Sequence, residues 1–301
     1  MKNLNFEIFN SYFCANLNVQ RCIEDMDSIT TIIKVGKYTF KIIDNTLSLR
    51  EQIYCRNFKI GGKQTDCVNV SISYNQNQPV AAVIPHVMYD ADCSEDPLPF
   101  DHSECSVIMI QTLLQHIHQQ LPTITEVKFE DKSSLECAPD IRLIPLYYFS
   151  IAFNGETWYE KYFNARQSDT NKHDKYRATI KNLLYSEELK TKTSFMQFLE
   201  IAQPPVEITN ELEQYYNKSV TFGDFFQMMP KQDRCRLVRD WIHIFMSHYL
   251  KDVFENKNWI IELPIAMNGG RRHTRKYYCP RGRIAHKITY KDFGIDLSNF
   301  S

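Results

Sequence analysis

Alternating apolar and polar residues in the first third of the chain predict an antiparallel sheet. Residues 68–74 alternate with a period of two, and the polar residues 75–78 separate them from the apolar run 79–88. Upstream, the stretches 28–35 and 38–43 flank Gly36-Lys37, a pattern typical of a second β-hairpin. We therefore expect the sheet to begin as an antiparallel meander.

The central part of the chain combines helical and strand patterns. Residues 105–121 predict a helix that ends at Pro122. Its apolar face would consist of Val107, Ile110, Leu113, Leu114 and Ile117. A strand pattern follows at residues 125–129, and the order strand, helix, strand predicts one parallel strand pair. Residues 141–153 predict an edge strand, and residues 156–163 predict a short helix.

A polar segment separates this region from a helical one. Residues 166–181 are almost wholly polar, which is typical of a domain boundary. Pro230 then fits the first turn of a long helix. The apolar stripe of that helix would consist of Val238, Trp241, Ile242, Phe245, Tyr249 and Val253. We predict an α+β domain over residues 1–165, a polar linker over 166–190 and a helical region over 191–301.

The composition is that of a globular protein and excludes several classes. The 301 residues are 43% hydrophobic and include 35 Lys or Arg and 36 Asp or Glu, which excludes a disordered or collagen-like chain. The nine cysteines are spread singly without a C-x-x-C pair, so we expect reduced thiols in an intracellular compartment. No apolar stretch approaches about 18 residues, and no signal-peptide core is present, so we expect neither membrane insertion nor secretion.

Positive charge is concentrated near the carboxyl end of the chain. Residues 264–291 contain eight basic residues and no acidic one: Arg271, Arg272, Arg275, Lys276, Arg281, Arg283, Lys287 and Lys291. Removing these eight from the total of 35 leaves 27 basic residues against 36 acidic ones. We name residues 271–291 the basic arm. Its cations alternate with Tyr277 and Tyr278, a pattern that favours nucleic acid, although an acidic protein partner or a merely solvated arm would fit as well.

Motifs for several common chemistries are missing from the sequence. It has no P-loop, no dinucleotide-binding glycine motif, no G-x-S-x-G and no H-E-x-x-H. His102 and Cys105 could share a metal ion, but two ligands do not make a metal site. The arginines around Cys279 would lower its pKa, yet a lone cysteine in a basic loop is more often inert. We therefore expect no metal.

The predicted elements of residues 28–165, together with one helix motif, resemble a known superfamily. Residues 158–165, Trp-Tyr-Glu-Lys-Tyr-Phe-Asn-Ala, resemble the helix that follows the fifth strand in the GNAT acyl-CoA-dependent N-acyltransferases. The resemblance implies a mixed, mostly antiparallel GNAT-like sheet. If the domain is catalytic, it also implies acetyl-CoA as cofactor. The candidate general bases are then Glu126 and Glu130, and the candidate general acids are Tyr147, Tyr148 and Tyr159.

The segment that would hold coenzyme A departs from this superfamily. GNAT enzymes bind the pyrophosphate with the backbone of a glycine-rich loop at a helix N-terminus. The matching residues 89–104 contain no Gly, Lys or Arg. They carry six carboxylates: Asp90, Asp92, Glu95, Asp96, Asp101 and Glu104. We therefore expect a degenerate acyltransferase-like domain that serves as a scaffold without a cofactor. The alternative is an N-acetyltransferase with an altered cofactor loop.

Four short segments of the sequence carry a second resemblance. Residues 126–133, 155–161, 277–282 and 292–294 resemble uncharacterised proteins of nucleocytoplasmic large DNA viruses. This resemblance implies a product made in the host cytoplasm, with a virion component as one form of the scaffold role. The sequence does not indicate an oligomeric state.

Overall fold

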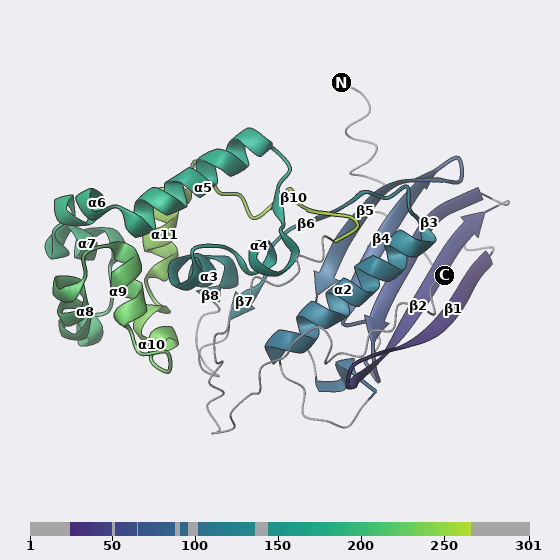
Figure 1. Ribbon diagram of the computed structural model, residues 1–301, viewed down its shortest axis with the longest axis horizontal. Helices are drawn as coiled ribbons and strands as arrows, with labels where there is room; N and C mark the ends of the chain where they lie inside the picture. Colours follow the sequence, from purple (N-terminus) through teal and green to yellow (C-terminus); the bar gives the residue numbers. More distant parts are fainter. Residues whose placement is uncertain are drawn as a thin grey trace. The chain divides into compact units, whose positions relative to one another are not determined.

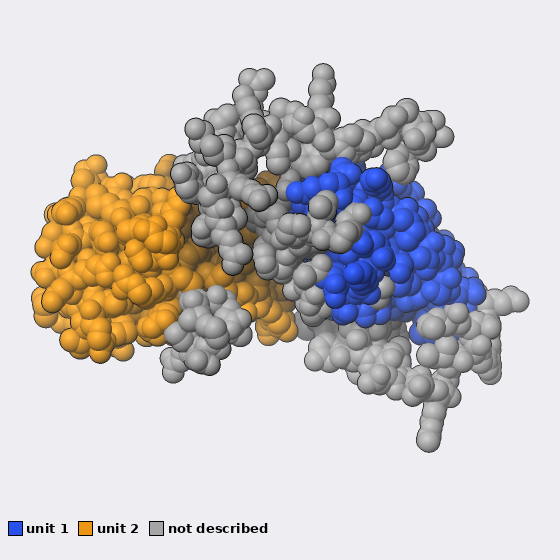
Figure 2. All heavy atoms as spheres, turned by 90° about the horizontal axis from the view of Figure 1, so that it is seen from below, with its two compact units in different colours: residues 1–129, 261–301 blue, residues 130–260 orange. Residues whose placement is uncertain are grey.

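The chain forms two compact units (Figure 2). The computed structural model describes residues 25–49, 52–64, 66–87, 91–95, 102–135 and 144–265. Unit 1 comprises residues 1–129 and 261–301, and unit 2 comprises residues 130–260. The division therefore falls at Phe129 and Ile261 and not within the polar segment 166–190, which belongs entirely to unit 2.

Unit 1 is a mostly antiparallel sheet with one long helix. Its elements are β1 (Asp25–Val35), β2 (Tyr38–Leu49), β3 (Gln52–Gly61), β4 (Val68–Asn75), β5 (Gln78–Val87), the 3-10 turn η1 (Ala91–Cys93), α2 (His102–Gln120) and β6 (Glu126–Phe129). The strand order is β1-β2-β3-β4-β5-β6, followed by β10 (Trp259–Glu262) (Figure 1). Successive strands from β1 to β5 pair antiparallel, and β5 and β6 pair in parallel. Both predicted hairpins and the parallel pair are confirmed, whereas β3 was not predicted.

The core of unit 1 lies between the sheet and α2, which crosses one face of the sheet (Figure 1). Residues opposite one another in antiparallel strands share a face, so the register of β2 to β4 gathers Phe40, Ile42, Phe58, Ile60, Val70 and Ile72, all buried. The predicted stripe of α2 is buried except for Val107, which is half-buried. Each large apolar side chain removed from water contributes about 1.5 to 3 kcal/mol.

A disulfide ties the η1 segment to the sheet. Cys67 and Cys93 are bonded and fully buried, so the prediction that the cysteines are all unpaired is wrong for this pair. Glu95 donates its backbone N–H to the carbonyl of Thr39 at 3.0 Å. A Cβ at Gly62 would lie 2.1 Å from the carbonyl carbon of Ser94, so this approach requires glycine. The disulfide forms because the fold brings two distant segments together. No cysteine-spacing motif in the sequence indicates it.

Unit 2 is helical. Its elements are β7 (Ser134–Leu135), β8 (Ile144–Pro145), α3 (Leu146–Asn154), α4 (Trp158–Phe163), β9 (Arg166–Gln167), α5 (Thr170–Tyr185), α6 (Glu187–Lys192), α7 (Phe195–Ala202), α8 (Val206–Lys218), α9 (Phe222–Met228), α10 (Arg234–Val238) and α11 (Ile242–Leu250). Its core is aromatic. The Phe198 ring centroid lies 5.2 to 5.9 Å from those of Phe195, Tyr216, Phe225, Trp241 and Phe245, which joins α7, α8, α9 and α11.

Three predictions for unit 2 change in the structure. In the described part of the strand expected over 141–153, residues 144–145 form β8, and residues 146–153 belong to α3 because Ser150–Phe153 pack inside the helical unit. The expected polar linker forms β9, α5 and α6, since α5 buries four residues: Tyr176, Ile180, Leu183 and Leu184. The long helix expected after Pro230 is divided into α10 and α11.

Candidate functional site

The two candidate general bases lie in surface ion pairs. On β6, the Glu126 carboxylate is 3.8 Å from the Lys128 ammonium, and both side chains are exposed. Glu130 is 2.9 Å from Lys132. Pairs of this kind contribute about 0 to 1 kcal/mol and are ordinary for a solvated strand end. These positions show no feature that would activate a carboxylate.

The candidate general acids are packed among other aromatic rings. Tyr147 and Tyr148 begin α3 with ring centroids 4.6 Å apart, and both contact Phe254. Burial raises the pKa of both phenols, that of Tyr147 to about 12. Tyr159 is 7% exposed, and burial raises its pKa further. These phenols stay protonated at neutral pH, but Tyr159 is closed to a substrate.

A carboxylate that sequence reasoning did not select has the most unusual environment in this region. Asp131 is 2% exposed and accepts hydrogen bonds from the backbone N–H of Ser133 at 3.1 Å and from the Ser133 hydroxyl. Burial raises the pKa of Asp131 to about 6, and its charge in turn raises the pKa values of Tyr147 and Tyr159. A general base needs both a suitable pKa and access to a substrate, and Asp131 has only the first. The Asp-x-Ser turn was the available signal.

The helix motif that carries the GNAT resemblance has a structural role here. Thr157 and Glu160 form a capping box, in which each side chain accepts the backbone N–H of the other residue. Glu160 also accepts hydrogen bonds from the Tyr176 hydroxyl at 2.8 Å and from Arg177 at 3.2 Å. Trp158 is half-buried, whereas Tyr159 is buried. The motif therefore joins α4 to α5.

Several predicted residues fall outside the described parts of the chain. The basic arm and Cys279 do so, as do Asp90, Asp96 and Asp101 of the acidic segment and the side chains of His102 and Glu104. Of the remaining acids, Glu95 pairs with Lys41 at 3.2 Å. Cys105 is fully buried in α2. Within the described ranges, no group of three metal-ligating side chains is gathered.

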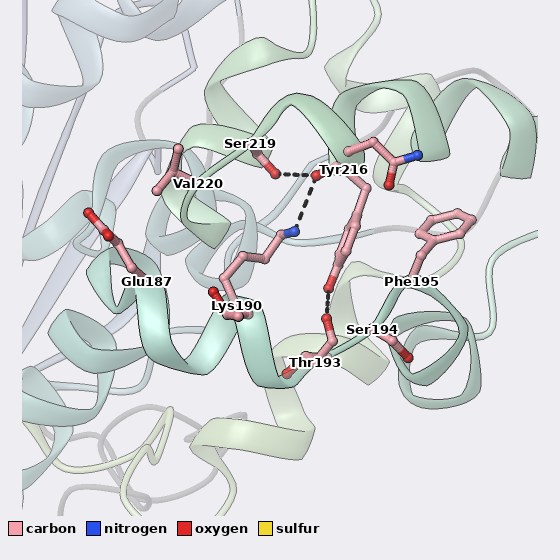
Figure 3. A pocket seen from close by; sticks show the side chains of 10 residues that line it. Glu187, Lys190, Thr193, Ser194, Phe195, Tyr216, Ser219 and Val220 are labelled. Atoms are coloured by element: carbon pink, nitrogen blue, oxygen red, sulfur yellow. Dashed lines mark hydrogen bonds between the residues drawn. The ribbon is translucent and has the colours of Figure 1, made fainter.

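A pocket of about 370 Å³ in unit 2 collects polar and aromatic side chains (Figure 3). It is lined by Lys190 of α6, by Thr193 and Ser194 before α7, by Phe195, by Tyr216 of α8 and by Ser219, among others. Lys190 is 7% exposed and donates to the backbone carbonyl of Tyr216 at 3.2 Å. Its ammonium also lies 3.2 Å from the centroid of the Tyr216 ring.

Burial lowers the pKa of Lys190 to about 8. No carboxylate of the described residues lies within 4 Å of its ammonium. The Tyr216 carbonyl is in the last turn of α8 and also accepts the Ser219 hydroxyl at 2.7 Å. A lysine beside the last carbonyls of a helix stabilises that helix end. Helix capping therefore accounts for the position of Lys190.

Unit 1 contains a buried ion pair that the sequence patterns did not indicate. Arg56 donates to both carboxylate oxygens of Asp44, at 2.8 and 2.5 Å, and Asp44 is 6% exposed. The guanidinium lies 4.7 Å from the centroid of the Phe58 ring. The pair lies on the face of the sheet that α2 covers.

No protein-family model matches this chain, and no curated protein or solved structure matches it. Its function is therefore argued from its own residues. Within the described ranges, no helix has the length and apolarity needed to cross a bilayer.

Proposed function

We propose that the protein is an interaction scaffold that does not transfer acyl groups. One observation carries this proposal: the candidate acids and bases that the structure describes are engaged in surface ion pairs or in packing within the fold. Glu126 and Glu130 are paired with lysines at the surface. Tyr159 and Asp131 are enclosed in unit 2. Tyr147 and Tyr148 are half-buried against each other and Phe254, so of the described candidates only these phenols and the lysine-paired carboxylates remain for the GNAT-like catalytic alternative.

The basic arm is the segment that we propose for partner binding, with single-stranded nucleic acid as the partner. The support is its sequence: eight cations between residues 264 and 291 with no carboxylate among them, next to Tyr277 and Tyr278. Cations neutralise phosphates, and aromatic rings stack on unpaired bases. An acidic protein surface would use the cations but not the stacking.

Calorimetric titration of the full chain with acetyl-CoA and with free coenzyme A tests the first part. We expect no binding heat at millimolar ligand, because the acidic segment 89–104 repels a pyrophosphate. Stoichiometric binding in the micromolar range would contradict the scaffold proposal. It would favour the N-acetyltransferase with an altered cofactor loop.

Fluorescence anisotropy with a single-stranded oligonucleotide over a salt series tests the second part. Changing Arg271, Arg272, Arg275 and Lys276 to Ala should reduce the slope of log K against log salt by about 3, since each phosphate contact contributes about 0.7. The control changes four exposed lysines to Ala with the same loss of charge: Lys175, Lys181, Lys218 and Lys231. Equal slopes in both variants would contradict binding by the arm. Binding of a poly-glutamate peptide in preference to the oligonucleotide would identify an acidic protein partner.

A further inference from the structure

The outer strand of the sheet in unit 1 is long and open. Within the described part of the chain, β1 pairs with β2 alone and forms the end of the sheet. Along its 11 residues, Ile29 is 61% and Ile32 58% exposed. Most natural proteins shorten, twist or charge such an edge, because its free backbone groups pair readily with another strand. This strand carries only Lys34 as a charge in its second half.

The turn between β1 and β2 determines which backbone groups are free. Gly36 and Lys37 form a two-residue loop, so Val35 and Tyr38 are the closing pair. The closing pair of such a hairpin is hydrogen-bonded, and bonded pairs alternate along an antiparallel ladder. The register runs from this pair to Asp25 and Ser48 without a shift. Odd-numbered residues of β1 therefore bond to β2, and even-numbered residues direct their N–H and C=O groups outward.

We propose that a second copy of this chain pairs with β1 in antiparallel orientation, which makes the protein a homodimer with one continuous sheet. The dyad between two such strands is perpendicular to the sheet and keeps each residue on its own face. Residues directly opposite one another also share a face. Each residue must therefore be opposite a residue of the same parity, which allows only registers centred on a residue.

The register centred on Ile32 fits the side chains of β1. It places the exposed Ile32 opposite Ile32 of the second copy and Ile29 opposite Val35, twice by symmetry. Ile29 and Val35 lie on the face of Phe40 and Ile42, which are buried in the core. The apolar layer of unit 1 would then continue across the dimer. On the other face, the even-numbered residues exchange the free backbone hydrogen bonds.

The neighbouring register is less favourable. Centring the pair on Thr31 places Asp27 opposite Val35 and leaves Ile32 opposite Thr30. A carboxylate would then lie against an apolar side chain twice, and the Ile32 to Ile32 pair would be lost. Charge and apolar matching therefore select Ile32 as the centre. The proposal does not depend on the basic arm or on the absence of acyl transfer.

Sedimentation equilibrium of the full chain tests the dimer. We expect a reversible monomer–dimer equilibrium, and Ile29→Lys should weaken it by at least 10-fold, because two like charges then meet apolar partners. The matched control is Val80→Lys on β5, an internal strand, where the side chain is 48% exposed. Val80→Lys should leave the equilibrium unchanged. A wild-type chain that stays monomeric to 100-fold above micromolar concentration would overturn the proposal, as would equal effects of the two variants.

Cross-linking tests the register separately. In the proposed pairing, Ile32 faces Ile32 as a hydrogen-bonded pair, whose Cα atoms lie within disulfide range. Ile32→Cys should therefore form a covalent dimer under mild oxidation, above the background of the wild-type chain. Thr31→Cys, one residue away, should not. Preferential cross-linking of Thr31→Cys would overturn the register centred on Ile32.

Discussion

Two cations, Arg56 in unit 1 and Lys190 in unit 2, have little solvent exposure, and they are satisfied in different ways. In unit 1, Arg56 meets the Asp44 carboxylate with two hydrogen bonds and lies against the Phe58 ring. In unit 2, Lys190 meets a helix-end carbonyl and the Tyr216 ring, without a carboxylate among the described residues. The hydrogen bonds that Arg56 donates to Asp44 raise the pKa of Arg56, whereas burial lowers the pKa of Lys190 to about 8.

The difference shows what each kind of scaffold can supply to a buried charge. Neighbouring strands place side chains directly opposite or diagonal to one another, so Asp44 on β2 can reach Arg56 on β3 in bidentate geometry. A helix end supplies a partial negative charge from its last carbonyls. A carbonyl dipole compensates an ammonium less fully than a carboxylate does. The lysine can respond by losing its proton, which arginine does not do.

Removal of the Asp44 carboxylate should have the largest effect on stability among the changes considered. Asp44→Ala leaves Arg56 largely enclosed without its anion, and we expect the free energy of unfolding of unit 1 to fall by about 3 to 5 kcal/mol. Urea unfolding of the full chain measures this loss. The double variant Asp44→Leu with Arg56→Met should recover most of it, because no unpaired charge remains. A loss under 1 kcal/mol for Asp44→Ala would mean that the pair is effectively solvated.

Lys190 should show its lowered pKa as a dependence of stability on pH. The unfolded chain has the ordinary lysine pKa of 10.5 and binds more protons between pH 8 and 10.5, so stability rises with pH through that window. Relative to Lys190→Met, the wild type should therefore gain up to about 3 kcal/mol between pH 8 and 10.5. Urea unfolding at several pH values measures the difference. Parallel profiles of the two proteins would show that the ammonium is not desolvated.

Asp131 is a buried acidic group, so its raised pKa should make stability depend on pH in the direction opposite to that expected for Lys190. Its pKa is about 6 in the folded chain against 3.8 ordinarily, so the folded state binds more protons in that window and stability falls as pH rises through it. Asp131→Asn keeps an acceptor for the Ser133 N–H and cannot ionise. We expect it to stabilise unit 2 by about 2 to 3 kcal/mol above pH 6 and little below pH 4, measured by thermal unfolding. Equal gains at both pH values would contradict this assignment.

The smallest effect should come from an exposed cation close to Lys190 in sequence. Lys192 pairs with Glu188 on the surface of α6 at the i,i+4 spacing. Lys192→Met should cost about 0.5 kcal/mol or less, which makes it the control for Lys190→Met. A loss of unfolding free energy as large as that expected for Asp44→Ala would show that the exposure of a cation does not determine what its removal costs.

Local patterns in the sequence determined the hairpins β1–β2 and β4–β5, the long helix α2 and the parallel strand after it. A period of two, a two-residue turn and an apolar helical stripe each depend on neighbours a few residues away, so the sequence alone indicates them. The GNAT resemblance, the basic arm and the acidic segment are likewise properties of the sequence, and they stay predictions.

Tertiary structure decided the rest, because burial and partners come from distant segments. Residues 146–154 read locally as a strand but form α3 inside a helical unit. Residues 170–185 read as a linker but form α5, which buries four side chains and packs against α9 and α11. Cys67 meets Cys93 across 26 residues, and Lys190 meets the Tyr216 carbonyl across the same separation. No local pattern encodes these approaches, since each is made by the packing of the whole unit.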